Sequence, residues 1–319
     1  MKVLVIGAAG MIGRKLVERL PGADLTLHDV VEPPQVPGAK TVVCDLAAPG
    51  AAEALLADRP ERIFHLAAVV SGEAEADFDK GYRVNLDGTR RLFEAIRQIG
   101  GDYRPRLVFT SSIAVFGAPF PDVIGDEFLN TPLTSYGTQK AIGELLLADY
   151  TLRGFLDGIG LRLPTICVRP GKPNKAASGF FSGIIREPLN GQAAVLPVPL
   201  TVRHWFASPR AAVGFLLHAA ALPTESLGAR RNLTMPGVCA SIGEQIAALK
   251  RVAGERAAQL IRHEPDATIM RIVSGWPQRF DAQRALSLGF RADASFDDII
   301  RIHIEDELQK SAQPLEDRA

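Results

Sequence analysis

The first thirteen residues constrain the fold of this chain more than any other segment. Residues 2–6 read KVLVI, a short continuous apolar run that is typical of a strand buried on both faces. Three glycines follow at a G-x-x-G-x-x-G spacing, and apolar residues at helical spacing come next. A strand, a glycine turn and a helix in this order predict a dinucleotide site, in which the helix amino terminus faces a diphosphate. The predicted diphosphate loop comprises Gly7, Gly10, Met11, Ile12 and Gly13.

An acidic residue ends the next predicted strand. Asp29 stands where a carboxylate accepts hydrogen bonds from the adenosine ribose hydroxyls. No basic residue follows it closely, and Glu32 adds a second negative charge that would repel a 2′-phosphate. The sequence therefore predicts NAD rather than NADP as the cofactor. At the end of the third predicted strand, Asp45 and Leu46 suit a contact with the adenine.

Strands and helices alternate along the first half of the chain. Further strands are predicted at 24–29, 40–46, 62–68, 105–112 and 160–171. Helices are predicted at 51–60, 81–100 and 135–154. This alternation predicts an α/β fold, a Rossmann-type doubly wound parallel sheet with helices on both faces.

The alternation changes after residue 171, where the chain becomes rich in Pro, Gly, Asn and Ser. We expect an NAD-binding domain over 1–170 and a smaller substrate-binding lobe over 171–319, partly interleaved with late sheet strands. Within the lobe, residues 241–264 and 296–308 are expected to be helical.

The composition excludes several classes of function. Lys and Arg total 36, as do Asp and Glu, so the net charge is zero and no nucleic-acid partner is expected. No apolar run approaches the ~20 residues that span a bilayer, and the chain begins with a strand, so we expect a cytoplasmic protein without a membrane partner. The cysteines and histidines follow no metal-ligand spacing, so no metal is expected. The three cysteines, which fit a reducing compartment, are Cys44, Cys167 and Cys239.

A tyrosine and a lysine open the helix predicted at 135–154. Tyr136 and Lys140 are four residues apart and share one helical face. An ammonium group close by stabilises phenolate, so we expect Lys140 to lower the pKa of Tyr136 from ~10. Such a phenol can take the proton of a substrate hydroxyl while hydride leaves the same carbon. Ser112, just after the fifth predicted strand, could hold the same oxygen, and Ser111 is the alternative.

Six motifs together resemble the extended short-chain dehydrogenase/reductase family, the NAD-dependent epimerase/dehydratase group. They are GAAGMIG (7–13), CDL (44–46), HLAA (65–68), VNLDGT (84–89), TSSIAVFG (110–117) and SYGTQK (135–140). The resemblance implies that Ser112, Tyr136 and Lys140 are catalytic, that Tyr136 and Lys140 also contact the cofactor, and that a homodimer is possible. The further residues implied at the cofactor are Ala67, Ala68, Ser71 and Asn85.

The second half departs from the family members that use nucleotide sugars. Those members usually carry Asn three residues after the Arg that ends the sixth strand, whereas Arg169 is followed by Lys172 at that spacing. A second signature, R-D-Y-I-H-V-x-D, reads RHWFASPRA at 203–211. Segments 169–189 and 280–308 instead resemble the branch that contains D-erythronate dehydrogenase.

The branch resemblance implies NAD-dependent oxidation of the 2-hydroxyl of a small sugar acid, such as D-erythronate, to the 2-oxo acid. Arginine grips a carboxylate in a two-point fork, so basic residues are the candidate partners of the acid. These are Lys172, Arg186, Arg203 and Arg210. The other residues expected in the substrate pocket are Ser71, Ser112, Ser178 and Trp205. Two alternatives stay open: an NAD-dependent nucleotide-sugar 4-epimerase of the UDP-glucose/UDP-galactose type, and a non-catalytic dinucleotide sensor.

Overall fold

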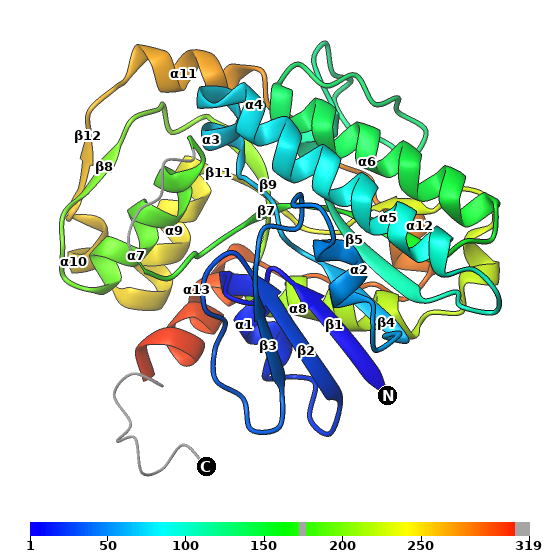
Figure 1. Ribbon diagram of the computed structural model, residues 1–319. Helices are drawn as coiled ribbons and strands as arrows, with labels where there is room; N and C mark the ends of the chain where they lie inside the picture. Colours follow the sequence, from blue (N-terminus) through cyan, green and yellow to red (C-terminus); the bar gives the residue numbers. More distant parts are fainter. Residues whose placement is uncertain (172–176, 310–319) are drawn as a thin grey trace.

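A seven-stranded parallel sheet forms the centre of the molecule (Figure 1). The computed structural model describes residues 1–171 and 177–309. The strands run in the order β10-β6-β5-β4-β1-β2-β3, so the direction of winding reverses between β1 and β4. Their bounds are β1 (Lys2–Ile6), β2 (Asp24–Asp29), β3 (Lys40–Val43), β4 (Arg62–His65), β5 (Arg106–Ser112), β6 (Asp157–Leu163) and β10 (Asn232–Thr234). This confirms the predicted Rossmann-type doubly wound sheet.

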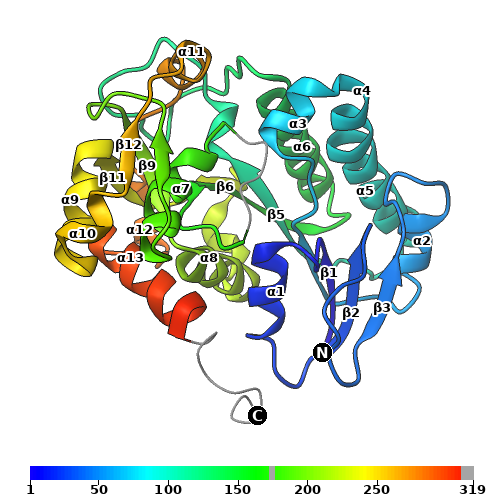
Figure 2. The same ribbon diagram turned by 90° about the vertical axis from the view of Figure 1, so that its left-hand side faces the viewer.

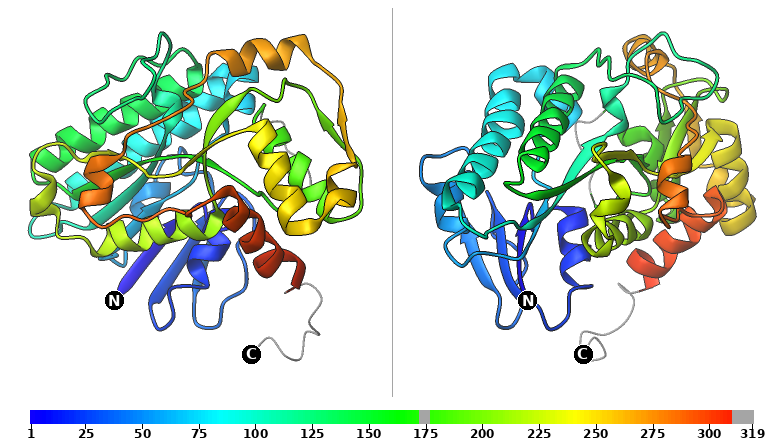
Figure 3. Two further views of the ribbon diagram at one scale, coloured as in Figure 1. Left: turned by 180° about the vertical axis from the view of Figure 1, so that it is seen from behind. Right: turned by 90° about the vertical axis from the view of Figure 1, so that its right-hand side faces the viewer.

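Helices cover both faces of this sheet, as the continuous apolar strands predict. Strand β1 shows the arrangement, because Val3 and Val5 pack into one core while Leu4 and Ile6 pack into the core on the opposite face. The first face carries α1 (Met11–Val17) and α8 (Pro209–Ala221), which lie side by side in Figure 3. The second face carries α2 (Ala51–Leu55), α5 (Gly88–Ile99) and α6 (Ser135–Leu152). A short run of α3 (Ser71–Ala76), α4 (Phe78–Gly81) and the π-helix η1 (Tyr82–Asp87) leads into α5.

A smaller lobe lies beside the sheet, on the side away from β3 (Figure 2). It has a three-stranded sheet, β11-β9-β7, and a two-stranded sheet, β12-β8. The strands are β7 (Thr165–Ile166), β8 (Ala194–Leu196), β9 (Arg203–Ala207), β11 (Val238–Ser241) and β12 (Ile261–His263). Its helices are α7 (Gly179–Leu189), α9 (Ile242–Ala253), α10 (Glu255–Ala258), α11 (Ala267–Ser274) and α13 (Phe296–His303), with the short helix η4 (Ile304–Gln309). Helices η3 (Thr224–Leu227) and α12 (Gln283–Ser287) pack instead against the core of the main sheet. Because β10 and α8 belong to the main sheet and its cover, the division at residue 170 stays a proposal.

The two largest errors in predicted extent concern one strand and one helix. The strand expected at 160–171 ends at Leu163, because Pro164 has no N–H to continue the ladder, and Thr165–Ile166 pair with β9 in the other sheet. The helix expected at 241–264 ends at Gly254, whose φ of +87° suits a helix stop, and residues 261–263 form β12. Within the described ranges, no helix combines the length and apolarity needed to cross a membrane.

Candidate active site

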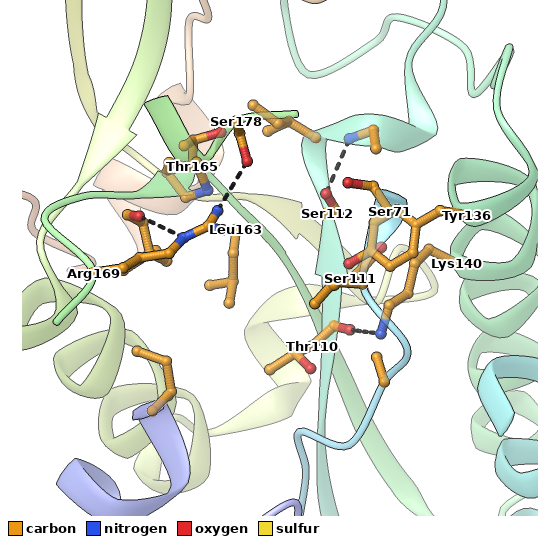
Figure 4. Close-up of a pocket in the computed structure, with 18 of the residues that line it drawn as sticks. Ser71, Thr110, Ser111, Ser112, Tyr136, Lys140, Leu163, Thr165, Arg169 and Ser178 are labelled. Carbon is orange, nitrogen blue, oxygen red and sulfur yellow. Dashed lines mark hydrogen bonds between the residues drawn. The ribbon is translucent and has the colours of Figure 1, made fainter. Parts of the chain in front are cut away.

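A cavity of about 500 Å³ lies between the main sheet and the smaller lobe (Figure 4). Its walls come from the glycine loop, the carboxyl ends of β4 and β5, the start of α6, the segment after β6 and the start of α7. Ligands of doubly wound sheets bind at the carboxyl ends of the strands, where the winding reverses. The cavity therefore has the place that the topology predicts.

The three predicted catalytic residues meet in this cavity. Ser112, Tyr136 and Lys140 all line it, from the end of β5 and the first turns of α6 (Figure 4). Lys140 is buried, and its Nζ donates to the carbonyl oxygen of Thr110 at 2.8 Å. The same Nζ lies 5.8 Å from the centre of the Tyr136 ring. The pair is therefore part of an enclosed site and not of a solvated helix face.

Local structure fixes the start of α6 against β5. The Thr134 hydroxyl caps the helix by accepting a hydrogen bond from the Gly137 amide at 3.0 Å. A side chain at Gly137 would place its Cβ 2.1 Å from the Ala114 carbonyl oxygen, so only glycine permits this approach. The close packing brings the Tyr136 phenol beside Ser112.

The expected lowering of the Tyr136 pKa is wrong for this structure. Burial raises the pKa of Tyr136 above its usual value near 10, and the nearby Ser112 hydroxyl and Arg169 guanidinium only partly oppose this. Burial also lowers the pKa of Lys140 to about 8, against the opposing charge of Glu144. Helical spacing brings the two side chains together, but the loss of hydration in the enclosed cavity is the largest influence on the pKa of each.

The alternative hydroxyl, Ser111, belongs to a buried polar network. Its Oγ donates to Glu144 Oε1 at 2.6 Å, and Arg162 forms an ion pair with the same carboxylate at 2.7 Å. By contrast, the Ser112 Oγ accepts a hydrogen bond from the Ala114 amide at 3.1 Å, and its hydroxyl lies beside the Tyr136 phenol in the cavity. This geometry favours Ser112 as the group that holds a substrate oxygen.

The glycine loop fits a dinucleotide diphosphate. All five loop residues predicted from the sequence line the cavity, and the first amides of α1 have no partners within the helix. Gly10 is exposed, and a Cβ there would meet no atom closer than 3.4 Å, so the space beside it is open to a ligand. Asp29 lies next to the loop, where its Oδ2 accepts from the Ala9 amide at 2.9 Å and its Oδ1 from the Val30 amide at 2.7 Å. Each oxygen keeps a lone pair for a ribose hydroxyl.

The remaining predicted cofactor residues divide into two groups. Ala68 and Ser71 line the cavity. Asp45, Leu46, Ala67 and Asn85 do not line it: Asp45 pairs with Arg83, and Leu46 is buried in the core. Asn85 accepts from the Val69 amide at 2.8 Å and donates to the Val69 carbonyl at 3.0 Å, so it supports the segment that bears Ala68 and Ser71 from behind.

Of the predicted substrate residues, Ser71, Ser112, Ser178 and Arg186 line the cavity, whereas Arg203 and Trp205 do not. Arg203 pairs with Glu244 at 3.1 Å, and Trp205 donates to the Met235 carbonyl at 3.1 Å. The physical reason is the alternation of β9, in which His204 faces the cavity and its two neighbours face the other side.

Of the two other basic candidates, only Arg210 is among the described residues, and it does not line the cavity. Arg210 is half-exposed and pairs with Asp306 at 2.6 Å and with Glu305 at 2.9 Å. Lys172 lies outside the described residues.

Several cavity residues were not predicted. Thr165 and Arg169 line the wall opposite Ser112 and Tyr136. His204, which hydrogen-bonds to Thr165, also lines the cavity. Pro164 is the sequence signal that could have revealed these residues. Because β6 ends at Leu163, the arginine near the end of the sixth strand is Arg162 and not Arg169. The third residue after Arg162 is Thr165. The segment after Pro164 thus belongs to the substrate side.

His204 is neutral, and its surroundings set its tautomer. Burial lowers the pKa of His204 to about 4, and the ring stacks on Phe181 at 5.2 Å between centres. Its Nδ1 lies 2.9 Å from the Pro277 carbonyl and must donate, so its Nε2 accepts from the Thr165 hydroxyl at 2.7 Å. The lone pairs of Thr165 therefore remain available to the cavity. Among the residues that the structure describes, no cluster of three or more His, Cys, Asp or Glu could hold a metal ion.

Comparison with known proteins identifies the family. The model of the NAD dependent epimerase/dehydratase family matches residues 3–220. D-erythronate dehydrogenase of Cupriavidus necator is 49% identical over 96% of this chain and 98% of its own length. The protein of the same name from Haemophilus influenzae is 42% identical over 96% of this chain and 99% of its own.

Solved structures agree on the fold. The structure described as a nucleoside-diphosphate-sugar epimerase from Agrobacterium tumefaciens is 62% identical, with a TM-score of 0.94 over 98% of this chain and 96% of that one. A GalE-like L-threonine dehydrogenase from Cupriavidus necator, 21% identical, superposes with a TM-score of 0.83 over 94% of this chain and 98% of that one, which shows the shared fold. The chain therefore belongs to the NAD-dependent epimerase/dehydratase family, a family of enzymes whose cofactor is NAD.

Proposed function

We propose that this enzyme oxidises the 2-hydroxyl of a small sugar acid, such as D-erythronate, to the 2-oxo acid. The single observation that carries the proposal is the grouping of Ser112, Tyr136 and Lys140 on one wall of the cavity, with cationic side chains on the facing wall. Two full-length relatives named D-erythronate dehydrogenase support it. The 62% identical structure carries an epimerase name, so the two activities must be separated by experiment.

The chain's own residues handle the proton. When bound, NAD supplies the hydride acceptor and a positive charge beside the phenol. We assign Ser112 to hold the substrate oxygen and Tyr136 to take its proton as a general base. Lys140, held by the Thr110 carbonyl at 2.8 Å, is placed to bind the nicotinamide ribose and to favour the phenolate form once a second positive charge is present.

The test is net formation of NADH. With NAD and D-erythronate the enzyme should accumulate NADH in proportion to the acid, whereas an epimerase returns the hydride to its product. Tyr136→Phe should lower turnover by ~10²–10⁴-fold, because general base assistance is lost. Tyr150→Phe is the matched control, since Tyr150 lies on the same helix, bonds to Glu94 and is remote from the cavity. Interconversion of UDP-glucose and UDP-galactose, with no NADH from any four-carbon acid, would replace this proposal by the epimerase.

We also propose a cytoplasmic location and a homodimer. Three free cysteines support a reducing compartment.

On α6, the exposed Leu145 and Leu152 are seven residues apart and form one apolar face. A four-helix contact between two copies would cover it, and sedimentation equilibrium would give the mass.

A further inference from the structure

One cation on the substrate side of the cavity forms no ion pair with a described residue. Arg169 lies across the cavity from Ser112 and Tyr136 (Figure 4). Its Nε donates to the Ile166 carbonyl at 3.1 Å, and its Nη2 donates to Ser178 Oγ at 3.2 Å. Within the described part of the chain, no carboxylate lies within ion-pair distance of this guanidinium. Because a guanidinium has five N–H donors, several remain for a ligand.

The other cations of the cavity differ from Arg169 in their partners or their position. Arg186 pairs with Glu187 at 2.5 Å, and its Nη1 donates to the Arg169 carbonyl at 2.7 Å. Lys140 donates to the Thr110 carbonyl and lies on the facing wall, beside Tyr136. A charge that is largely removed from water and lacks a counterion is costly. Arg169 is therefore the group in this wall that a bound anion would stabilise most.

The surrounding contacts hold Arg169 in one orientation. Ser182 Oγ accepts from its amide at 3.0 Å, and Arg186 binds its carbonyl oxygen. Together with the bonds from Nε and Nη2, these contacts fix both the backbone and the guanidinium plane. A guanidinium held in this way is suited to a two-point grip on a carboxylate.

We propose that Arg169 binds the carboxylate of the substrate and thereby selects the hydroxyl that is oxidised. This inference rests on the proposed function. Arg169 and Tyr136 line facing walls of the same cavity. A small acid held between them would present its carboxylate to Arg169 and a hydroxyl to Tyr136, as a 2-hydroxy acid can. Arg203, which faces away from the cavity, has no such role.

The experiment compares Arg169→Met with Arg203→Met. For D-erythronate at saturating NAD, Arg169→Met should raise KM roughly 10- to 150-fold, because a charge-assisted pair is lost. Arg203→Met should leave KM near the wild-type value. The uncharged amide of D-erythronate provides the second readout: its kcat/KM should be low in the wild type and should barely change in Arg169→Met. Arg169→Lys, which keeps the charge but loses the fork, should give an intermediate KM.

Binding measurements separate this role from a structural one. The Kd of NADH and the unfolding midpoint of Arg169→Met should stay close to wild type, whereas the Kd of D-erythronate for the enzyme–NADH complex should rise with KM. If Arg169→Met does not fold, Arg169→Lys carries the same comparison. An unchanged KM, or an equal loss for the acid and its amide, would overturn the assignment while the proposed function stands. A wild type that forms no NADH from any sugar acid would overturn both.

Discussion

Substitutions at Gly10 and Gly13 should distinguish the part of the glycine loop that packs against the protein from the part that contacts the cofactor. A Cβ on Gly13 would lie 2.2 Å from the Gly7 carbonyl oxygen and 2.8 Å from Ala8 Cα. Both are backbone atoms that cannot rotate away, so Gly13→Ala must displace the loop. Overpacking typically costs about 1–3 kcal/mol, and we expect a loss near the top of that range in the free energy of unfolding.

Gly10→Ala should behave in the opposite way. Its φ of −68° suits any residue, and the nearest atom to a new Cβ is the Gly7 carbonyl oxygen at 3.4 Å. The free energy of unfolding should therefore change by less than about 0.5 kcal/mol. The methyl group would, however, occupy the open space where a diphosphate approaches the loop, so the Kd of NADH should rise at least about tenfold, or ~1.4 kcal/mol.

The assay measures urea unfolding without cofactor and NADH binding by fluorescence for both variants. Gly214→Ala is the matched control: it lies inside α8, exposed, with no atom within 4 Å of a new Cβ. It should stabilise the protein by about 0.5–1 kcal/mol and leave NADH binding unchanged. Wild-type NADH affinity in Gly10→Ala, or wild-type stability in Gly13→Ala, would refute the division of roles.

Two further predictions concern cofactor choice and acid stability. Asp29→Asn should raise the ratio of kcat/KM for NADP to kcat/KM for NAD by about tenfold, because a charge that repels the 2′-phosphate is removed. If the ratio stayed unchanged while the stability fell, Asp29 would serve only to accept the hydrogen bond from the Ala9 amide. Three histidines are buried neutral, with pKa values lowered to about 3, 4 and 4 by burial, namely His65, His204 and His303. Because the unfolded chain binds these protons first, stability should fall as the pH drops from 6.5 toward 4, by up to about 1.4 kcal/mol per pH unit for each histidine. Unfolding free energies measured at pH 7, 6 and 5 would contradict this if they stayed level.

The cofactor half of the molecule was predictable because its signals are local. The strand, glycine turn and helix that form the diphosphate loop occupy sixteen consecutive residues, and β2 has the predicted bounds of 24–29. Tyr136 and Lys140 meet through helical spacing alone. Spacing carries no information on burial, however, and burial reverses the expected direction of the Tyr136 pKa.

The substrate side was predicted less well because the sequence of its strands does not show which face of each strand lines the cavity. In β9, which reads RHWFA, four of the five residues are buried, so apolar and polar positions do not alternate. The predicted residues Arg203 and Trp205 lie on the face of β9 that points away from the cavity. His204, between them, lies on the face that lines it. Only the pairing of β9 with β7 and β11 determines which face meets the cavity.

Pro164 accounts for both the error in the sixth strand and the existence of the opposite wall. Without an N–H it cannot extend the ladder of β6 with β5, so the chain leaves the main sheet after Leu163. Thr165–Ile166 pair with β9 of the lobe instead, which turns the next residues toward the cavity and carries Arg169 to the side facing Tyr136. An apolar run that reads as one strand therefore contributes to two sheets, and the cavity lies where it changes from one to the other. Because Arg169 follows this change, it belongs to the substrate wall, although its position in the sequence lies within the segment first assigned to the cofactor domain.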